Sequence, residues 1–272
     1  MLTRFQEELI PVLMRTRSER SYFAGGTTLN YSLPRCSSDF DIFHDEHEMC
    51  AKAFITDIDL LKAHGYSIEI LRTPEKNGIG EVVVSNGIEK TEIQWATDSV
   101  YRFFPIEKDD CFGFQLNYHD LAMNKILALA GRSEVRDYYD VCEMIATNKP
   151  VIAYIWAACA KDPGYTPLSL LEYMSMNTKY QNEDFFSIYS KNKLDIRFCK
   201  DLFLRMSHEA REQFQLAPID EYGCLYLKKE TYEVFFPDKD DFENGNYIKH
   251  FARPFGSIPQ FQVEEDSGPS PF

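Results

Sequence analysis

Two aspartates separated by one residue are the strongest chemical signal in the sequence. Asp39 and Asp41 alternate with the apolar residues Phe40 and Ile42, which predicts a strand with both carboxylates on one face. Carboxylates held side by side repel each other unless a divalent cation lies between them. Mg²⁺ suits such a pair because it binds one or two carboxylates together with phosphate oxygens. The pair therefore predicts a site for Mg²⁺ or Mn²⁺, and the alternative is a solvated Asp-x-Asp loop.

A short aromatic segment and a glycine pair precede the aspartates. Residues 21–24 are typical of a buried strand, and Gly25-Gly26 lets the backbone turn with no Cβ facing a ligand. Thr27 or Thr28 is expected to cap the helix that follows, whose free N–H groups and dipole favour an anion such as phosphate. Gly25, Gly26 and Thr27 are thus candidates for holding a phosphate, although a plain Gly-Gly turn is the alternative.

A hairpin further along offers a third carboxylate. Residues 81–85 and 88–95 read as strands on either side of Asn86-Gly87, the preferred pair for a type I′ turn. Alternation places Glu92 on the polar face of the second strand, in the same predicted sheet as the aspartate pair. A solvent-facing residue on a two-stranded ribbon is nearly as good an interpretation.

Two helices are predicted to supply further charged groups. Residues 118–130 form the first, capped by Asn117 and containing Lys125, and residues 133–146 form the second. The second helix places three charged residues on neighbouring surface: Arg136, Asp137 and Asp140. From composition alone, a salt bridge on the helix face is the preferred interpretation of these three.

Composition limits the class of protein. The chain has 272 residues, enough for one large or two small domains, and its net charge of −14 argues against unspecific coating of nucleic acid. Seven cysteines without a Cys-x-x-Cys motif predict free thiols in a reducing cytosol. The first eight residues have no signal-peptide core, and the longest apolar run, 151–160, is too short to span a bilayer. We therefore expect a soluble, cytoplasmic protein without a membrane partner.

The predicted fold class is α/β, with a mixed sheet flanked by helices and followed by a mainly helical lobe. We assign residues 1–112 to the sheet-bearing core and residues 113–236 to the helical lobe. Residues 237–272 are rich in Pro, Gly, Asn and acidic residues, which predicts an extended or partly ordered tail.

Several of these motifs together resemble one superfamily. The segments Gly25-Gly26-Thr27 and Ser38-Asp39-Phe40-Asp41 look like the signature of the nucleotidyltransferase superfamily that includes DNA polymerase beta. The form in this chain is similar to the AbiEii/AbiGii toxin branch, with one extra residue between Arg35 and the aspartates. Residues 120–125 and 132–140 resemble that branch's Asp-Leu-Ala-x-x-Lys and Arg-Asp-x-x-Asp patterns. The resemblance covers residues 22–145, about half the chain.

The resemblance implies roles for the candidate residues. The implied metal ligands are Asp39, Asp41 and Glu92. The implied catalytic residues are these three with Lys125, which faces the triphosphate, and Asp137 of a second acidic motif. The implied nucleotide-binding residues are Gly25, Gly26, Thr27, Ser38, Lys125, Arg136 and Asp140.

The implied reaction moves a nucleoside monophosphate from a nucleoside triphosphate to an acceptor hydroxyl. The branch implies a toxin with a cognate antitoxin, and the 3′ end of tRNA as acceptor. A cationic rim (Arg35, Arg102, Lys125, Arg132 and Arg136) and the aromatic residues Tyr101, Phe103 and Phe104 are expected to receive that end. Two alternatives stay open: nucleotidylation of a protein or small molecule, and a nucleotide-binding module without turnover.

Overall fold

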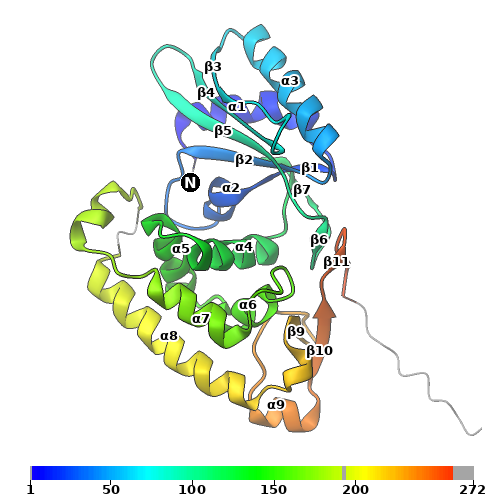
Figure 1. The fold of residues 1–272 in the computed structure, drawn as a ribbon, viewed down its shortest axis with the longest axis vertical. Helices are drawn as coiled ribbons and strands as arrows, with labels where there is room; N and C mark the ends of the chain where they lie inside the picture. Colours follow the sequence, from blue (N-terminus) through cyan, green and yellow to red (C-terminus); the bar gives the residue numbers. More distant parts are fainter. Residues whose placement is uncertain (1, 192–193, 260–272) are drawn as a thin grey trace, which may run out of the picture.

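A seven-stranded mixed sheet carries the aspartate pair (Figure 1). The structure, a computed structural model, describes residues 2–191 and 194–259. The sheet has the order β3-β4-β5-β2-β1-β8-β7. Its strands are β1 (Ser21–Ala24), β2 (Asp39–His44), β3 (Ser67–Arg72), β4 (Ile79–Ser85), β5 (Lys90–Thr97), β7 (Glu107–Asp109) and β8 (Gly113–Gln115). β2 runs antiparallel to β1 and parallel to β5, so the predicted mixed α/β fold is confirmed.

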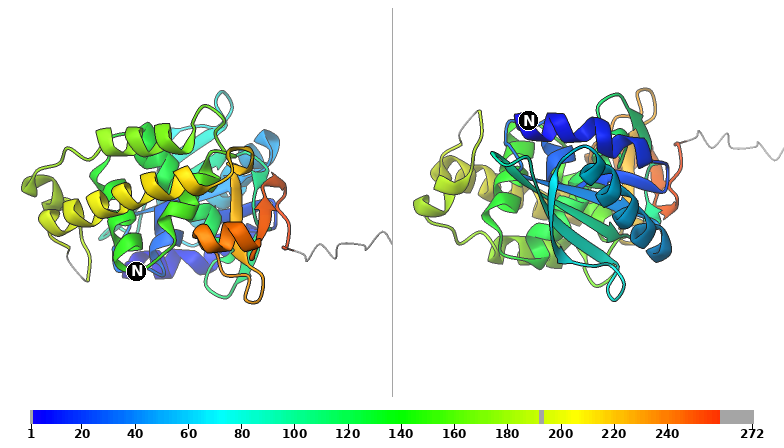
Figure 2. Two further views of the ribbon diagram at one scale, coloured as in Figure 1. Left: turned by 90° about the horizontal axis from the view of Figure 1, so that it is seen from below. Right: turned by 90° about the horizontal axis from the view of Figure 1, so that it is seen from above.

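Two helices, α1 (Arg4–Leu13) and α3 (His47–Ala63), cover one face of this sheet, as the right-hand view of Figure 2 shows. Phe40 of β2 and Trp95 of β5 are fully buried beneath them. The ring of Phe54 meets Trp95 edge-on, with 5.2 Å between ring centroids. Because side chains alternate along a strand, burying Phe40 turns Asp39 and Asp41 to the opposite face.

A helical lobe lies against that opposite face (Figure 1). Its helices are α4 (Tyr118–Gly131), α5 (Val135–Ala146), α6 (Val151–Ala158), α7 (Pro167–Met176) and α8 (Ile196–Leu216), and the short α2 (Gly25–Asn30) lies between the lobe and β2. The predicted Asn117 cap is present, since its side chain accepts the amide of His119 at 2.8 Å. Short 3-10 helices are Met14–Thr16, Asn182–Ser187 and Ile219–Glu221.

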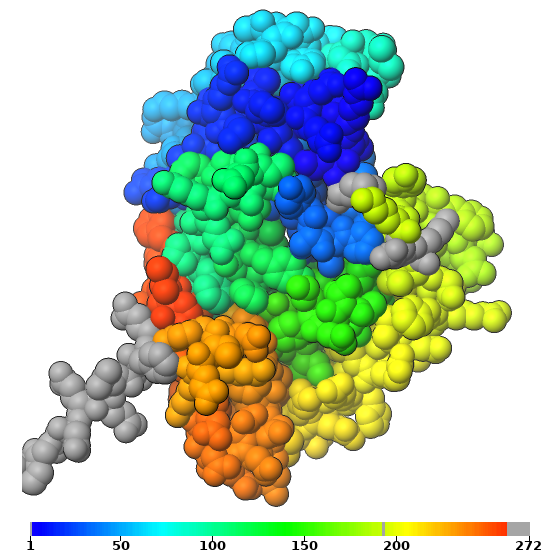
Figure 3. Space-filling view, turned by 180° about the vertical axis from the view of Figure 1, so that it is seen from behind, coloured from blue at the N-terminus to red at the C-terminus, as the bar shows by residue number. Residues whose placement is uncertain are grey.

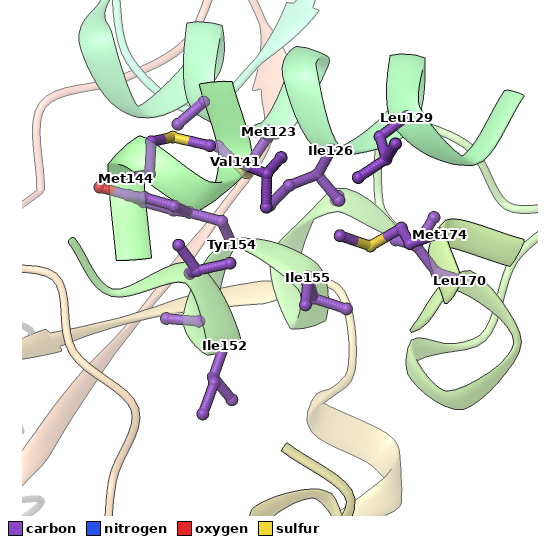
Figure 4. Packing of buried hydrophobic residues seen from close by; sticks show 14 of the residues in the cluster. Met123, Ile126, Leu129, Val141, Met144, Ile152, Tyr154, Ile155, Leu170 and Met174 are labelled. Carbon is purple, nitrogen blue, oxygen red and sulfur yellow. The ribbon is translucent and has the colours of Figure 1, made fainter. Parts of the chain in front are cut away.

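The lobe is organised around α6, whose eight residues are all buried. Figure 4 shows Ile152, Tyr154 and Ile155 of this helix beneath Met123 and Ile126 of α4. A helix that is apolar on all sides needs neighbours on all sides, and α4, α5, α7, α8 and β9 (Cys224–Lys228) supply them. Despite this apolar character, none of the helices in the described residues has the length and hydrophobicity to cross a membrane.

The C-terminal segment differs from the predicted tail. Residues 237–259 contain α9 (Lys239–Asn244), β10 (Tyr247–Phe251) and β11 (Arg253–Pro254). β10 pairs with β9, and β11 pairs with β6 (Tyr101–Arg102) of the first half of the chain. The physical reason is aromatic packing, because Phe242 and Tyr247 both contact the buried ring of Tyr226. Residues 260–272 lie outside the described residues.

Two smaller features refine the prediction. The turn between β4 and β5 has four residues rather than two, because the Asn86 side chain accepts the amides of Ile88 and Glu89 at 3.0 and 2.9 Å. The strand β8 begins beyond residue 112 yet pairs with β1 of the main sheet. The division of the chain into domains stays a prediction.

Candidate active site

Asp39 and Asp41 lie on one face of β2 as predicted, beside α2, with Arg136 of α5 bonded to Asp39 and Lys125 of α4 lining the same cavity as Asp41. Burial, followed by the negative charge of Asp39, raises the pKa of Asp41 to about 6. The two carboxylates therefore repel each other in the folded protein, as their spacing in the sequence predicted. A divalent cation would relieve it, because hard carboxylate oxygens are the ligands that Mg²⁺ and Mn²⁺ prefer.

The glycine turn before α2 lies directly against Asp41. Gly25 has φ of +68°, and a Cβ built on it would fall 1.7 Å from Asp41 Oδ2. The amide of Gly26 donates to the same oxygen at 3.4 Å. Gly25 is therefore required by its close approach to the Asp41 side chain, and a Cβ on Gly26 would fall 3.0 Å from Ser37 Oγ.

Thr27 and Thr28 differ from the prediction. The helix α2 begins at Gly25 and has no side-chain cap, so neither threonine caps it. The hydroxyl of Thr27 instead donates to the backbone carbonyl of Asp39, and that of Thr28 donates to the carbonyl of Ala24 at 2.7 Å. Thr27 thus holds α2 against β2, which positions the aspartates. Its predicted role as a phosphate ligand is untested.

Two groups engage the carboxylate of Asp39. Arg136 Nη1 of α5 lies 3.2 Å from Asp39 Oδ2, and the hydroxyl of Ser37 donates to Asp39 Oδ1 at 2.5 Å. The sequence analysis selected Ser38, whose backbone carbonyl accepts the Thr91 hydroxyl at 2.7 Å. Ser37 was missed, and the only signal in the sequence is its position two residues before Asp39.

Glu92 stands opposite Asp39 in the β2–β5 register, on the polar face predicted for it. A hydrogen bond with Glu81, then burial and the charge of Asp39, raise the pKa of Glu92 to about 7. Within residues 2–191 and 194–259, no three His, Cys, Asp or Glu side chains converge as a metal cluster. The oxygen donors available to a divalent cation here are the carboxylates of Asp39 and Asp41, with Glu92 on the neighbouring strand.

A buried ion-pair network supports the site from the helical side. Lys125 Nζ of α4 lies 2.7 Å from Asp137 Oδ1 and 3.0 Å from Asp140 Oδ2, both on α5. Arg35 donates twice to Asp140, from Nε at 2.5 Å and from Nη2 at 2.9 Å. Arg132 Nε donates to Asp137 at 2.8 Å. The predicted salt bridge on one helix face is in fact a network between α4, α5 and the loop before β2.

The network determines the charge states of the two aspartates. Burial alone would raise the pKa of Asp137 and Asp140, but the cationic partners hold both pKa values below the usual range. Both side chains are fully buried, and the Lys125 side chain is 8% exposed. Arg132, whose side chain is 52% exposed, is the part of this network that a ligand reaches first.

Two cavities flank the aspartate pair. The Asp41 cavity, of about 350 Å³, is lined by Gly25, Gly26, Asp41, Phe43, Gln94, Leu121, Asn124, Lys125, Ala128, Gly131 and Arg132. The Arg136 cavity, of about 550 Å³, adjoins Asp39 through Ser37 and Arg136. A larger cavity of about 1080 Å³ lies in the helical lobe, and its lining in the described chain includes neither aspartate. The two smaller cavities are therefore the ones that adjoin the aspartate pair.

Arg102, Phe103 and Phe104 do not belong to the predicted rim, whereas Tyr101 is 38% exposed. Arg102 is buried and lies 2.8 Å from Asp45, which follows the far end of β2. Phe103 is fully buried, and Phe104 packs on His250 with 4.8 Å between ring centroids. An arginine beside three aromatics looked like a nucleic-acid surface, but its buried aspartate partner makes it part of the core. Of the predicted rim, the structure gathers Arg35, Lys125, Arg132 and Arg136 around the site.

No protein-family model and no curated protein matches the sequence. Among solved structures, the chain is similar to MenT4, a nucleotidyltransferase toxin from Mycobacterium tuberculosis H37Rv. The TM-score is 0.41 at 12% identity, over 76% of this chain and 89% of MenT4. It is also similar to Cid1, a structure described for RNA terminal uridylyl transferase activity, with a TM-score of 0.30 at 13% identity, over 91% of this chain and 78% of that one. Likenesses this distant carry no argument about activity, which has to come from the site.

Proposed function

We propose that this protein is a metal-dependent nucleotidyltransferase that moves a nucleoside monophosphate from a nucleoside triphosphate to an acceptor hydroxyl. One observation carries the proposal. Asp39 and Asp41 share one face of β2, and Asp41 lines the same cavity as the glycine turn, Lys125 and Arg132. Paired carboxylates beside cationic groups are what phosphoryl chemistry with a divalent ion requires.

Each group has a role in this proposal. Asp39 and Asp41 would hold Mg²⁺ or Mn²⁺, which when bound stabilises the negative charge that develops on the reacting phosphate. Lys125 would orient the triphosphate, because Asp137 and Asp140 take two of its three donors and leave the third for a phosphate oxygen. Glu92 would accept the proton of the attacking hydroxyl, since a base with a pKa of about 7 suits neutral pH.

A transfer assay tests the proposal directly. Wild-type protein is incubated with each α-labelled nucleoside triphosphate and Mg²⁺ or Mn²⁺, and with tRNA, total protein or small-molecule hydroxyls as acceptors. We expect label in one acceptor class, none with a chelator, and none with Asp39→Asn or Asp41→Asn. Near wild-type transfer by either variant contradicts the assignment. Triphosphate binding without transfer to any acceptor favours the binding module instead.

We further infer, from the AbiEii resemblance alone, that the acceptor is the 3′ end of tRNA and that the protein is a toxin with a cognate antitoxin. Arg132 and Arg136 at the mouth of an otherwise acidic protein suit a short RNA end, so transfer should weaken steeply with salt. Induced in a bacterial host, wild type should slow growth and Asp39→Asn should not. Equal growth of both strains contradicts the toxin role and leaves nucleotidyl transfer untouched.

A further inference from the structure

The Arg136 cavity and the Asp41 cavity share no lining residue within the described chain, and each adjoins one aspartate of the pair. Asp41 lines the first cavity described above, whereas Asp39 contacts Ser37 and Arg136, which line the second. The lining of the Arg136 cavity is Thr3, Arg35, Cys36, Ser37, Ser38, Glu134, Val135, Arg136, Ser187, Ile188 and Tyr189. Each carboxylate of the pair thus adjoins its own cavity, and a two-substrate reaction has to hold a second substrate near the same pair.

The segment that contains Ser187, Ile188 and Tyr189, which line the Arg136 cavity, is bonded to the loop before β2. The amide of Cys36 donates to the Tyr189 carbonyl at 2.8 Å, and the backbones of Arg35 and Ser190 form an isolated antiparallel β-bridge. Glu143 joins the same two segments, because it accepts the Ser190 hydroxyl at 3.0 Å and the Arg35 amide at 3.4 Å. Figure 3 shows this side of the molecule, with the loop before β2 in blue beside the yellow-green segment.

Two side chains give the cavity a chemical character. The Tyr189 residue is 70% exposed although its backbone is held, so its ring is presented to solvent at the cavity. The Arg136 side chain is 40% exposed, and one of its N–H groups donates to Asp39. Its other N–H groups can donate to a ligand. A ring and a guanidinium together suit a planar base and a phosphate.

The charge of the cavity separates it from the triphosphate site. Arg35 is already bonded twice to Asp140, and Glu134 adds a carboxylate to the lining. Arg136 is therefore the main cationic group offered here, whereas Lys125 and Arg132 both line the Asp41 cavity. A triphosphate suits the Asp41 cavity, and a ligand with a single phosphate suits the Arg136 cavity.

We propose that the Arg136 cavity is the acceptor subsite, in which Tyr189 stacks on the terminal base of the acceptor and Arg136 binds its phosphate. This inference rests on the proposed nucleotidyl transfer. In the step, the acceptor hydroxyl oxygen forms a bond to the α-phosphorus and its proton passes to Glu92. The bond from the α-phosphorus to the bridging oxygen breaks, and pyrophosphate leaves with the electron pair. Tyr189 thereby selects the acceptor and takes no part in binding the triphosphate.

Binding measured separately for the two subsites tests the assignment. The probes are the labelled ribotrinucleotide CCA and AMP for the acceptor subsite, and each nucleoside triphosphate with Mg²⁺ for the other. Tyr189→Ala should weaken CCA binding about tenfold, because one base loses its stacking partner. Tyr189→Phe should keep wild-type affinity. None of these variants should change triphosphate affinity.

Phe186 provides the matched control. It is 73% exposed on the same segment, and the described residues that line the cavity do not include it, so Phe186→Ala should leave CCA affinity unchanged. Equal weakening by Phe186→Ala, or unchanged CCA affinity in Tyr189→Ala, overturns the subsite. So does a wild type that binds a triphosphate but neither CCA nor AMP. Equal affinities of the wild type for AMP and CCA identify a mononucleotide acceptor rather than an RNA end. A wild type that binds no triphosphate overturns the proposed function itself.

Discussion

Gly25 lies so close to Asp41 that a single added methyl group would reach 1.7 Å from the carboxylate oxygen Oδ2. The two residues are joined through the β1–β2 pairing, in which Ala24 stands opposite Asp41. The turn and the carboxylate therefore form one unit, and any side chain at position 25 must displace Asp41 or the turn itself.

The first prediction separates this contact from backbone strain. Gly25 and Gly87 both have positive φ, +68° and +91°, but nothing lies within 4 Å of a Cβ on Gly87. Gly87→Ala should lower the free energy of unfolding by about 1–2 kcal/mol, the usual cost of a left-handed alanine. Gly25→Ala should lower the free energy of unfolding by more than Gly87→Ala does, and it should also abolish binding of Mn²⁺. Urea denaturation and metal titration of both variants check this, and equal losses would contradict the contact.

The second prediction concerns the metal-free stability of Asp41→Asn. A half-buried carboxylate next to Asp39 is costly when ionised, and its pKa of about 6 reflects that cost. Asn removes the charge and can still accept the Gly26 amide. At pH 8 in chelator, the variant should unfold with a free energy roughly 1–3 kcal/mol higher than wild type, from about 1.4 kcal/mol per pKa unit. A destabilised Asp41→Asn would show that the pair is not strained without metal.

The third prediction distinguishes the two cations of the Asp41 cavity. Lys125→Met leaves the buried Asp137 and Asp140 short of a partner, so the unfolding free energy should fall by about 3–5 kcal/mol. Arg132 is half exposed, so Arg132→Ala should cost less than about 1 kcal/mol. Both should weaken triphosphate binding. Calorimetry and thermal melting measure the two effects, and full triphosphate affinity in Arg132→Ala would remove it from the site.

A fourth prediction uses the pH dependence of stability. Burial raises the pKa of Glu143 from 4.5 to about 7, so the folded protein binds a proton there more tightly than the unfolded chain does. The contribution of Glu143 is therefore most favourable below pH 4.5 and is lost as pH rises from about 4.5 to about 7. The stability of Glu143→Gln should not fall over this pH range. At pH 8 its free energy of unfolding should exceed that of wild type by roughly 1–2 kcal/mol, after allowance for solvent screening. Parallel stability curves for the two proteins between pH 5 and 8 would contradict it.

The fifth prediction follows from the corrected position of Arg102. Arg102→Ala leaves Asp45 buried without its partner, so the unfolding free energy should fall by about 3–5 kcal/mol. Triphosphate and CCA affinities per folded molecule should stay at wild-type values at a temperature where the variant remains folded. A variant of normal stability that loses CCA binding would return Arg102 to the acceptor site.

The local parts of the site could be predicted from the sequence. Alternation of Asp39 and Asp41 with Phe40 was enough to place both carboxylates on one face, because strand periodicity is local. The same rule placed Glu92 on the polar face of β5, and a cap at Asn117 located the start of α4. These predictions hold in the folded protein because each depends only on a few neighbouring residues and on which face of the strand or helix is buried.

Only the tertiary structure decided how the charges pair. Arg136 reaches Asp39 from 97 residues away, and Arg35 reaches Asp140 from 105 residues away. Arg102, by contrast, is committed to Asp45 at the other end of β2. Nothing local selects among these arginines, because a buried charge takes whichever opposite charge the packed helices and strands bring to it. The sequence by itself determined which polar side chains share a face of a strand or helix, and packing determined which of them meet.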